Sequence, residues 1–378
     1  MYDLSRRELL QGASAAAAGV FLPLPAAAGA DVSLDGLAQK KGLRFGSAIS
    51  AGQVNNSRYV EIVKRDCGVI VAENAHKWYT ILPQPGEWNF VPGDAIAEFA
   101  KTNDLKLRGH TLLWHHPRWL PDWVNALDFA NAAEAEALLG DYIERVAGRY
   151  NPLVCSWDIV NEAVDDKTGE LRETAFSKAM GSDVIEFCFR KARQAAPNAT
   201  LAYNDYMSWE SGNENHRRGV LKLLERLKKN GAPIDALGVQ SHSNYDMPNE
   251  FTAGKQREWR KFVDDVTALG LDIYITEFDV NDTRLSPDPD FRDNLIAAYT
   301  KDYLDLMLDH KEVKGVLVWG LVDSESWLQT FLPREDGVMK RPCIYDENYH
   351  AKPMRQAVAD ALTAAPVRAA GPGLSSDL

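Results

Sequence analysis

Cysteine is scarce in this sequence, with four residues among 378: Cys67, Cys155, Cys188 and Cys343. Their spacing matches none of the short patterns by which cysteines bind zinc. Cys67 and Cys155 lie at the starts of predicted strands and Cys188 lies in a predicted helix, where a thiol packs as a small apolar side chain. We therefore expect free thiols and no bound metal.

Positive charge is also limited, because 42 Lys and Arg face 54 Asp and Glu, which gives a net charge of −12. Such a chain repels the phosphates of nucleic acids and anionic lipid headgroups unless a basic face is segregated. The densest basic runs, at 217–218 and 228–229, fall within a helical pattern and are interpreted as a solvated helix face. No nucleic-acid partner is expected.

Long apolar runs are absent after Asp31, so no segment of the mature chain is expected to enter a membrane. The N-terminus has the sequence SRRELL at 5–10, then an Ala-rich apolar stretch, then small residues at 26–30. This pattern resembles a twin-arginine signal peptide over residues 1–30. A membrane anchor is the alternative, but Pro23 and Pro25 interrupt the run. We expect export to the periplasm or the extracellular space.

The rest of the chain is patterned as repeated βα units, in which short apolar segments alternate with longer segments of helical period. Eight strands are predicted, at 44–48, 68–71, 106–109, 156–160, 200–203, 236–239, 272–275 and 315–318. Helices are predicted between them, including those at 134–150, 183–196, 214–229, 255–269 and 294–310.

Eight parallel strands covered by helices close most naturally into one α/β domain, a (β/α)8 TIM barrel spanning 31–363. An open doubly wound sheet is the alternative, but no Gly-rich phosphate loop follows the first predicted strand. Residues 364–378, rich in Ala, Gly, Pro and Ser, are expected to form a disordered tail.

Polar or aromatic residues follow seven of the eight predicted strands. They are Glu73, Asn74, His110, Trp114, His115, Asn161, Glu162, Asn204, Asp205, Gln240, His242, Glu277 and Trp319. Each alone could be a helix cap or a satisfied buried polar group. Because the carboxyl ends of barrel strands converge on one face, their coincidence predicts an active site there.

Two carboxylates stand out among these residues. Glu162 directly follows an apolar strand, and desolvation there raises a carboxyl pKa toward a value suited to proton donation. Its alternative role is helix capping, which Asn161 would serve as well. Glu277 ends a strand three positions further around the ring, so the two carboxylates face each other across the barrel mouth. A narrow pair suits double displacement and a wider pair suits inversion.

His242 and Asp279 lie near the ends of the sixth and seventh strands, where they could hydrogen-bond Glu277 and keep it ionised. A zinc site built from His110, His115, His116 and His242 is the alternative. No zinc-binding motif such as His-Glu-x-x-His is present, so no metal and no other cofactor is expected.

Tryptophans are concentrated in the predicted strand-to-helix connections, at 78, 114, 119, 123, 209, 319 and 327. Flat rings over a barrel mouth suit the apolar faces of sugar rings. The aromatic residues therefore favour a carbohydrate ligand.

These residues together resemble the glycoside hydrolase family 10 xylanases over roughly residues 45–353. The segments that carry the resemblance are RGHTLLWH (108–115), WDIVNEA (157–163), NDY (204–206), QSHS (240–243), ITEFD (275–279), VWG (318–320) and SWL (326–328). The resemblance implies retaining endo-hydrolysis of β-1,4-xylan, with Glu162 as acid/base and Glu277 as nucleophile.

The same resemblance implies further roles. Asn161 would contact the sugar 2-hydroxyl, where hydrogen bonds strengthen in the transition state, and His242 would orient Glu277. The residues expected to bind substrate are Glu73, Asn74, Lys77, His110, Trp114, Asn161, Tyr206, Gln240, Trp319 and Trp327. The last two would crowd the position of a glucose hydroxymethyl group, which favours xylose.

The sequence departs from this family in two places. The loop from His116 to Trp123 is about two residues longer, and Pro117 cannot make the contact of the family's glutamine. Met207 stands where the family often has asparagine. Two alternative functions remain: a related β-glucanase, suggested by the altered loop, and a carbohydrate-binding protein without catalysis, which would not need both carboxylates. Xylan or xylo-oligosaccharides are the expected partners of a monomeric enzyme.

Overall fold

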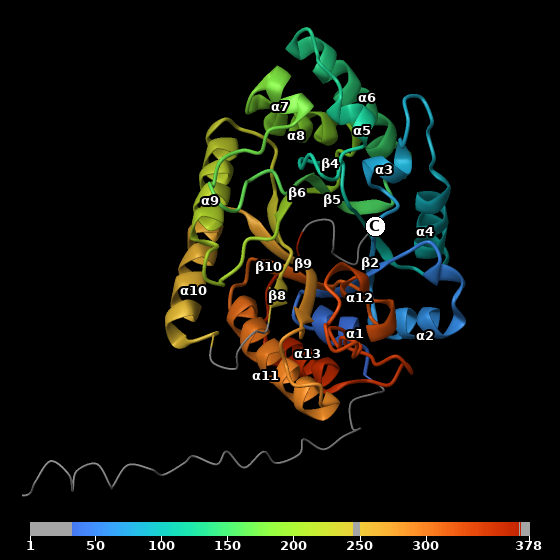
Figure 1. Cartoon of the computed structure of the whole chain (residues 1–378), viewed down its shortest axis with the longest axis vertical. Helices are drawn as coiled ribbons and strands as arrows, with labels where there is room; N and C mark the ends of the chain where they lie inside the picture. The colour runs from blue at the N-terminus through green and yellow to red at the C-terminus, as the bar shows by residue number, and fades with distance from the viewer. Residues whose placement is uncertain (1–31, 245–249, 370, 372–378) are drawn as a thin grey trace, which may run out of the picture. The chain divides into compact units, whose positions relative to one another are not determined.

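The computed structural model describes residues 32–244, 250–369 and 371 of this protein. Eight of its strands form a closed parallel barrel in the order β10-β1-β2-β3-β5-β6-β7-β9, and the β10–β9 pairing closes the ring (Figure 1). Their bounds are β1 Arg44–Ile49, β2 Val69–Ala72, β3 Lys106–Gly109, β5 Val154–Asn161, β6 Thr200–Asp205, β7 Ala236–Val239, β9 Asp272–Asn281 and β10 Val313–Val318. The predicted (β/α)8 barrel is confirmed.

Each predicted strand is present, and the main differences lie at the carboxyl ends. β9 extends to Asn281, six residues beyond its predicted end, because the short strand β8 (His242–Asn244) pairs with its extension. A second short strand, β4 (Leu113–Trp114), extends the sheet alongside β5. Both additions extend the sheet at the barrel mouth, one beside β5 and the other beside β9.

Helices surround the strands in Figure 1. They are α1 Leu34–Gln39, α2 Ser57–Asp66, α3 Trp78–Ile81, α4 Val91–Thr102, α5 Asp122–Asn125, α6 Ala132–Tyr150, α7 Ala175–Met180, α8 Asp183–Ala195, α9 Glu214–Lys229, α10 Ala253–Thr267, α11 Pro289–Leu308, α12 Leu328–Phe331 and α13 Pro353–Ala364. Two 3-10 turns, Gln53–Asn55 and Asp323–Glu325, lie in the loops after β1 and β10.

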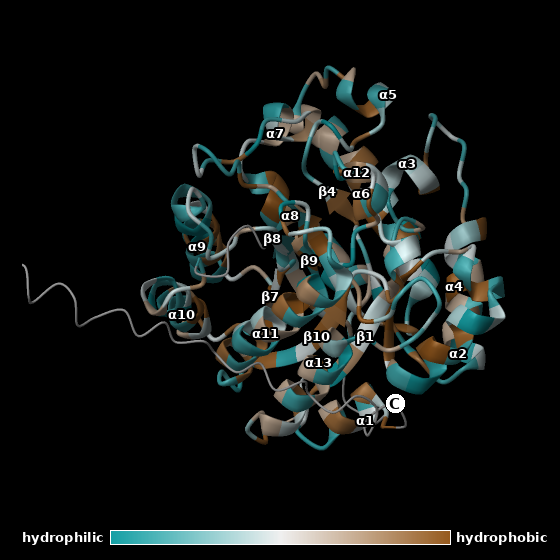
Figure 2. Cartoon of the chain, turned by 60° about the horizontal axis from the view of Figure 1, so that its bottom comes forward, coloured by the Kyte–Doolittle hydropathy of each residue, from teal (hydrophilic) through white to brown (hydrophobic). Residues whose placement is uncertain are grey.

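The helices are amphipathic, and Figure 2 shows hydrophobic residues concentrated in the strands and on the inner sides of the helices. In α9, Val220, Leu224 and Leu227 are buried at helical spacing, whereas Lys228 and Lys229 are exposed. The interpretation of the basic runs as a solvated face is wrong for Arg217, which is buried and donates to the carbonyl oxygen of Ser208 at 2.6 Å.

Two apolar layers follow from the alternation of side chains along the strands. In β2, Val69 and Val71 belong to a cluster inside the barrel, while Ile70 and Ala72 belong to the core between strands and helices. The interior also holds the ion pair of Arg108 with Asp158, whose side chains are 1% and 0% exposed. The barrel is thus filled below its mouth, and a ligand has access only from the rim.

The predicted boundary of a disordered tail at residue 364 is too early. Arg368 is buried, and its guanidinium donates to the carbonyl oxygens of Leu308, His310 and Val313 at 2.7–2.9 Å. It thereby anchors residues 365–369 beside the start of β10, because a guanidinium can satisfy several free carbonyls at once. Residues 372–378 and the predicted signal peptide, 1–30, lie outside the described residues.

The four cysteines are buried and unbridged, as predicted. No helix within residues 32–244, 250–369 and 371 combines the length and apolar character needed to cross a bilayer.

One buried histidine is a source of instability. His76 is 0% exposed, and neither ring nitrogen has a hydrogen-bond partner among the described residues. Its ring instead packs against Tyr150 at 4.6 Å and Trp157 at 5.2 Å between centroids. Burial lowers its pKa to about 3, assisted by the nearby His110.

We expect His76→Met to raise the free energy of unfolding by about 1–2 kcal/mol at neutral pH, because it removes an unsatisfied buried polar group. The unfolded imidazole binds a proton near pH 6.5 and the folded one near 3, so the wild type loses stability as pH falls through that window. The melting temperature should therefore drop less from pH 7 to pH 4.5 in His76→Met. His350→Met, at a 79% exposed side chain, is the control, and equal drops in all three proteins would contradict the prediction.

Candidate active site

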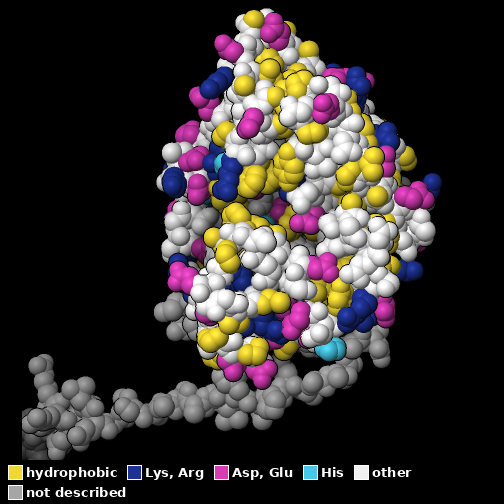
Figure 3. Space-filling model, turned by 45° about the vertical axis from the view of Figure 1, so that its right-hand side comes forward, with side chains coloured by type: hydrophobic (Ala, Val, Ile, Leu, Met, Phe, Trp, Pro, Cys, Tyr) yellow, Lys and Arg dark blue, Asp and Glu magenta, His cyan; other side chains and the backbone are white. Residues whose placement is uncertain are grey.

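A cavity of about 570 Å³ opens at the carboxyl ends of the barrel strands. Figure 3 shows a hollow in one face, with hydrophobic side chains gathered around it. The predicted site residues that line the cavity are Glu73, Asn74, Lys77, His110, Trp114, Glu162, Tyr206, Gln240, His242, Glu277, Asp279, Trp319 and Trp327. Asn161 does not line it; this residue is buried beside Glu162, with its Nδ2 3.2 Å from Glu162 Oε1. The fold thus gathers the predicted set in one place.

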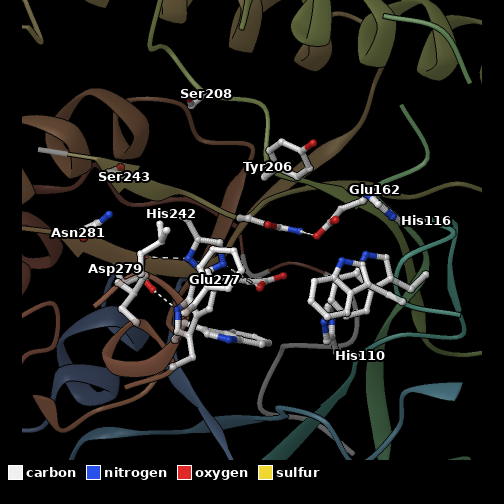
Figure 4. Close-up of a pocket in the computed structure, with 18 of the residues that line it drawn as sticks. His110, His116, Glu162, Tyr206, Ser208, His242, Ser243, Glu277, Asp279 and Asn281 are labelled. Atoms are coloured by element: carbon white, nitrogen blue, oxygen red, sulfur yellow. Dashed lines mark hydrogen bonds and ion pairs between the residues drawn. The ribbon is translucent and has the colours of Figure 1, made fainter. Parts of the chain in front are cut away.

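Glu162 directly follows β5, and its backbone adopts a φ of +55°. This left-handed conformation is uncommon for residues other than glycine and costs about 1–3 kcal/mol. Two hydrogen bonds hold it: the Glu162 N–H donates to the Asn204 carbonyl at 2.9 Å, and Arg172 Nε donates to the Glu162 carbonyl at 3.1 Å. The turn ends the strand and directs the carboxyl group into the cavity (Figure 4).

The environment of Glu162 favours its protonated form. Burial raises its pKa to about 6, and the negative charge of Asp205 adds to the increase. Gln240 Nε2 donates to Glu162 Oε1 at 2.8 Å, which opposes the increase without cancelling it. Glu162 therefore exchanges its proton close to neutral pH.

Glu277 has the opposite environment, although it is also buried. Burial alone would raise its pKa, but His110, His242 and Lys77 outweigh that effect and lower the pKa to about 2. Asn204 Nδ2 lies 2.7 Å from one carboxylate oxygen and His242 Nε2 lies 3.2 Å from the other. Glu277 is therefore ionised across the working range of an ordinary enzyme.

His242 is held between two carboxylates, with Nε2 toward Glu277 and Nδ1 3.0 Å from Asp279 Oδ1 (Figure 4). Burial would lower its pKa, but the charge of Asp279, with help from Glu277, raises it to about 10. Trp327 Nε1 donates to the second oxygen of Asp279 at 2.8 Å and fixes that carboxylate. The imidazole is thus a positively charged bridge that supports Glu277.

A hydrogen-bonded chain of amides joins the two glutamates through the barrel mouth. Asn161 Nδ2 lies 3.2 Å from Glu162 Oε1. Asn161 Oδ1 accepts a hydrogen bond from Asn204 Nδ2 at 2.8 Å. Asn204 reaches Glu277 with the same nitrogen, while Thr276 Oγ1 donates to its oxygen at 2.7 Å and sets the orientation of the amide. This chain fixes both carboxyl groups relative to each other.

His110 and Lys77 lie on the side of the cavity formed by the ends of β2 and β3. His110 Nδ1 lies 2.9 Å from Asp158 Oδ2, which is also bound by Arg108. Lys77 Nζ donates to Asn74 Oδ1 at 3.0 Å and lies 4.6 Å from the centre of the Trp114 ring. Among the described residues, no three His, Cys, Asp or Glu side chains form a group that could hold a metal ion.

The model of glycosyl hydrolase family 10 matches residues 33–361. This chain belongs to glycosyl hydrolase family 10. Endo-1,4-beta-xylanase B of Thermotoga neapolitana is 32% identical over 337 residues, which cover 87% of this chain and 91% of the relative. Native xylanase 10B of Thermotoga maritima is 34% identical with a TM-score of 0.78, over 88% of this chain and 98% of that chain. Xylanase 10B of Thermotoga petrophila RKU-1, solved in complex with xylobiose, has the same identity, TM-score and coverage of this chain, and 97% of that chain is covered.

Membership of family 10 makes this protein a glycoside hydrolase, so the alternative of a carbohydrate-binding protein without catalysis is set aside.

Not all the tryptophans assigned to the mouth of this family 10 barrel lie there. Trp78 is 2% exposed and stacks on Tyr142, and Trp209 is 3% exposed. Trp78, Trp123 and Trp209 do not line the cavity, whereas Trp114, Trp119, Trp319 and Trp327 do.

The cavity of this family 10 enzyme also includes residues outside the set expected to bind substrate or to catalyse, although Trp119 was expected at the barrel mouth and His116 was weighed as a zinc ligand. They are Tyr79, His116, Arg118, Trp119, Asp166, Ser208, Glu210, Asn213, Ser243, Asn244, Asn281, Leu328, Phe331 and Leu332. Asn281 could have been found, because the β-branched and aromatic character of β9 continues past its predicted end. The others lie in irregular loops or in the short elements α3, β8 and α12, which are too short to give a periodic signal. Pro117 and Met207 do not line the cavity.

Proposed function

We propose that this family 10 enzyme is an endo-1,4-β-xylanase that hydrolyses internal bonds of xylan by double displacement, with Glu277 as nucleophile and Glu162 as acid/base. One observation carries the proposal: two buried glutamates at one cavity have pKa values displaced in opposite directions, to about 6 and about 2. A retaining glycosidase needs one proton donor and one ionised nucleophile. The xylanase relatives and the xylobiose complex of a similar structure support the substrate.

In the first step, a Glu277 carboxylate oxygen attacks the anomeric carbon of the sugar on the non-reducing side. The bond to the departing sugar oxygen breaks, and Glu162 gives that oxygen its proton. In the second step, the Glu162 carboxylate takes a proton from water, whose oxygen attacks the same carbon and releases Glu277. The enzyme regains its starting protonation, and the product keeps the anomeric configuration of the substrate.

The surrounding residues support these two steps. We propose that Asn161 contacts the sugar 2-hydroxyl, since its amide already lies within 3.2 Å of Glu162. His242, held by Asp279, keeps Glu277 ionised before the attack. Glu73, Asn74, Lys77, His110 and Trp114 would bind the non-reducing side of the cleavage point, and Tyr206 and Gln240 also contact the substrate.

The preference for xylose over glucose is proposed to come from Trp319 and Trp327. Both rings line the cavity and pack against His242, at 6.3 Å and 4.9 Å between centroids. Because His242 is held by Glu277 and Asp279, the two tryptophan rings packed against it have little freedom to move aside for a hydroxymethyl group. We further propose that the N-terminal twin-arginine motif directs export of the enzyme, since a polymeric substrate is met outside the cell. We also propose that the enzyme acts as a monomer.

Release of reducing sugar from xylan and from carboxymethylcellulose tests the substrate. We expect the rate on xylan to exceed that on carboxymethylcellulose by at least about 100-fold, because a tightly packed pocket that must shift for an extra group discriminates by a few kcal/mol. Comparable rates on the two polymers would favour the related β-glucanase instead.

A further inference from the structure

The loop that sets this chain apart, His116–Trp123, forms one wall of the cavity. Trp119 stacks on Trp114, with ring centroids 4.8 Å apart and an angle of 19°. The guanidinium carbon of Arg118 lies 4.7 Å from the centre of the Trp119 ring. Trp114, Trp119 and Arg118 all line the cavity, so they form a continuous wall, with Trp114 near Glu162.

The position of Arg118 is fixed by its backbone as well as by the ring. Its N–H donates to His116 Nδ1 at 3.1 Å, which requires that nitrogen to be unprotonated. Burial lowers the pKa of His116, and the positive charges of Arg172 and Arg118 lower it further. The loop geometry is therefore compatible with neutral and mildly acidic pH.

Arg118 differs from the other basic side chains of the cavity because no described residue forms an ion pair or hydrogen bond with its guanidinium. Lys77 donates to the amide oxygen of Asn74, and its charge is compensated by Glu277, Glu73 and Glu162. His110 lies beside Asp158, and His242 lies between Glu277 and Asp279. Within the part of the chain that the structure describes, the Arg118 guanidinium has no ion pair and no hydrogen bond, and the residue is exposed.

Six carboxyl side chains outnumber the basic side chains in the lining of the cavity. The carboxylates are Glu73, Glu162, Asp166, Glu210, Glu277 and Asp279. A negatively charged ligand group would be repelled along most of this surface. Arg118 is the place in the described lining where such a group meets an uncompensated positive charge.

We propose that Arg118, held on Trp119, binds the carboxylate of a uronic-acid branch on the xylan chain, so that acid-branched xylan is a preferred substrate. This inference rests on the proposed xylanase function and extends it to the substrate's side groups. A guanidinium that places its face on an aromatic ring keeps its N–H donors in the plane, free for a carboxylate. The two parallel hydrogen bonds of such a pair give stronger and more directional binding than an ammonium would.

The test compares two matched polymers: glucuronic-acid-branched xylan, and the same polymer after reduction of its carboxyl groups to alcohols. The quantity measured is the ratio of kcat/KM on the acidic polymer to kcat/KM on the reduced one. We expect Arg118→Gln to lower this ratio about tenfold at low salt, the effect of losing one charge-assisted hydrogen-bond pair at a solvent-accessible site. Arg118→Lys should lower it less, and added salt should lower it in the wild type.

Arg145 provides the matched control, because its guanidinium carbon also lies over a tryptophan, Trp88, at 5.0 Å but outside the cavity. Arg145→Gln should leave the ratio unchanged. A variant that disturbs the loop would lower kcat/KM on both polymers equally and leave the ratio intact, and that result would overturn the inference. A wild-type ratio of one that Arg118→Gln does not change would also overturn it while leaving the xylanase assignment in place. Failure of the wild type on both polymers would instead contradict the proposed function.

Discussion

Glu277→Ala should lower kcat on xylan by at least about 10⁴-fold, because removing a nucleophile leaves only binding and electrostatic effects to accelerate the reaction. The environment of the residue makes this loss specific. His242, Asn204 and Lys77 surround the carboxylate, and no other described carboxylate is held by the same groups. The measurement is reducing-sugar release by the purified variant under saturating substrate.

The same variant offers a sharper test of the mechanism. The alanine leaves space where the carboxylate stood, and a small anion such as azide or formate can enter it and attack the anomeric carbon from the same face. One displacement then replaces two, so a glycosyl azide of inverted configuration should form from an activated aryl xyloside. Glu170→Ala, at an exposed carboxylate outside the cavity, controls for loss of charge and should behave as the wild type. Full activity of Glu277→Ala would contradict the assignment, and rescue with the original configuration would contradict double displacement.

Glu162→Gln should lower kcat/KM on xylan by about 10²–10⁴-fold, the contribution of a positioned general acid. The loss of glycosylation rate should be much smaller on an aryl xyloside with a nitrophenolate leaving group, which departs without a proton. The amide preserves the shape of the carboxyl group and its place beside Gln240 and Asn161, so misfolding is not expected. An equal loss on both substrates would contradict the role of Glu162 as proton donor.

The pH profile adds an independent readout for the same residue. Glu162 donates only when protonated, and its pKa is about 6, so kcat/KM of the wild type should fall as pH rises above that value. Glu277 attacks only when ionised, and its pKa of about 2 places the acid limb of the profile near that pH. Because the two carboxyl groups interact, the two apparent pKa values of the pH profile belong to the pair and not to either residue alone. On xylan, the limb near pH 6 should be present in the wild type and absent in Glu162→Gln; on the aryl xyloside, whose leaving group departs without a proton, the wild type should show a much weaker limb there.

The sequence predicted much of the fold because barrel strands carry strong local signals. Residues 106–109 and 236–239 are predicted and observed with the same bounds. The second of them is a short apolar run, ALGV, between polar residues. The strand around 272 was predicted six residues too short. Its last part is held by pairing with β10 at Phe278 and with β8 at Asp279–Asn281, and the β8 partners lie 37 residues away in the chain (from His242 to Asp279).

The active site could likewise be located from the sequence, because the topology of a parallel barrel brings every strand end to one face. Glu162, Glu277 and His242 were predicted by that rule. The aromatic residues were harder to assign, since a loop tryptophan can turn inward or outward. Trp78 and Trp209 pack into the core with their indole nitrogens satisfied by Leu112 and Tyr299, which no local pattern indicates.

The sequence by itself therefore determined the barrel, the family and the pair of glutamates at its mouth, because periodicity and strand-end position are local properties of the chain. Only the tertiary structure decided how those glutamates differ. Burial and the charge of Asp205 raise the pKa of Glu162, whereas the hydrogen bond from His242 and electrostatic interaction with His110, His242 and Lys77 lower that of Glu277. These charges come from four different strand ends, and their distances to each carboxyl group exist only once the ring has closed.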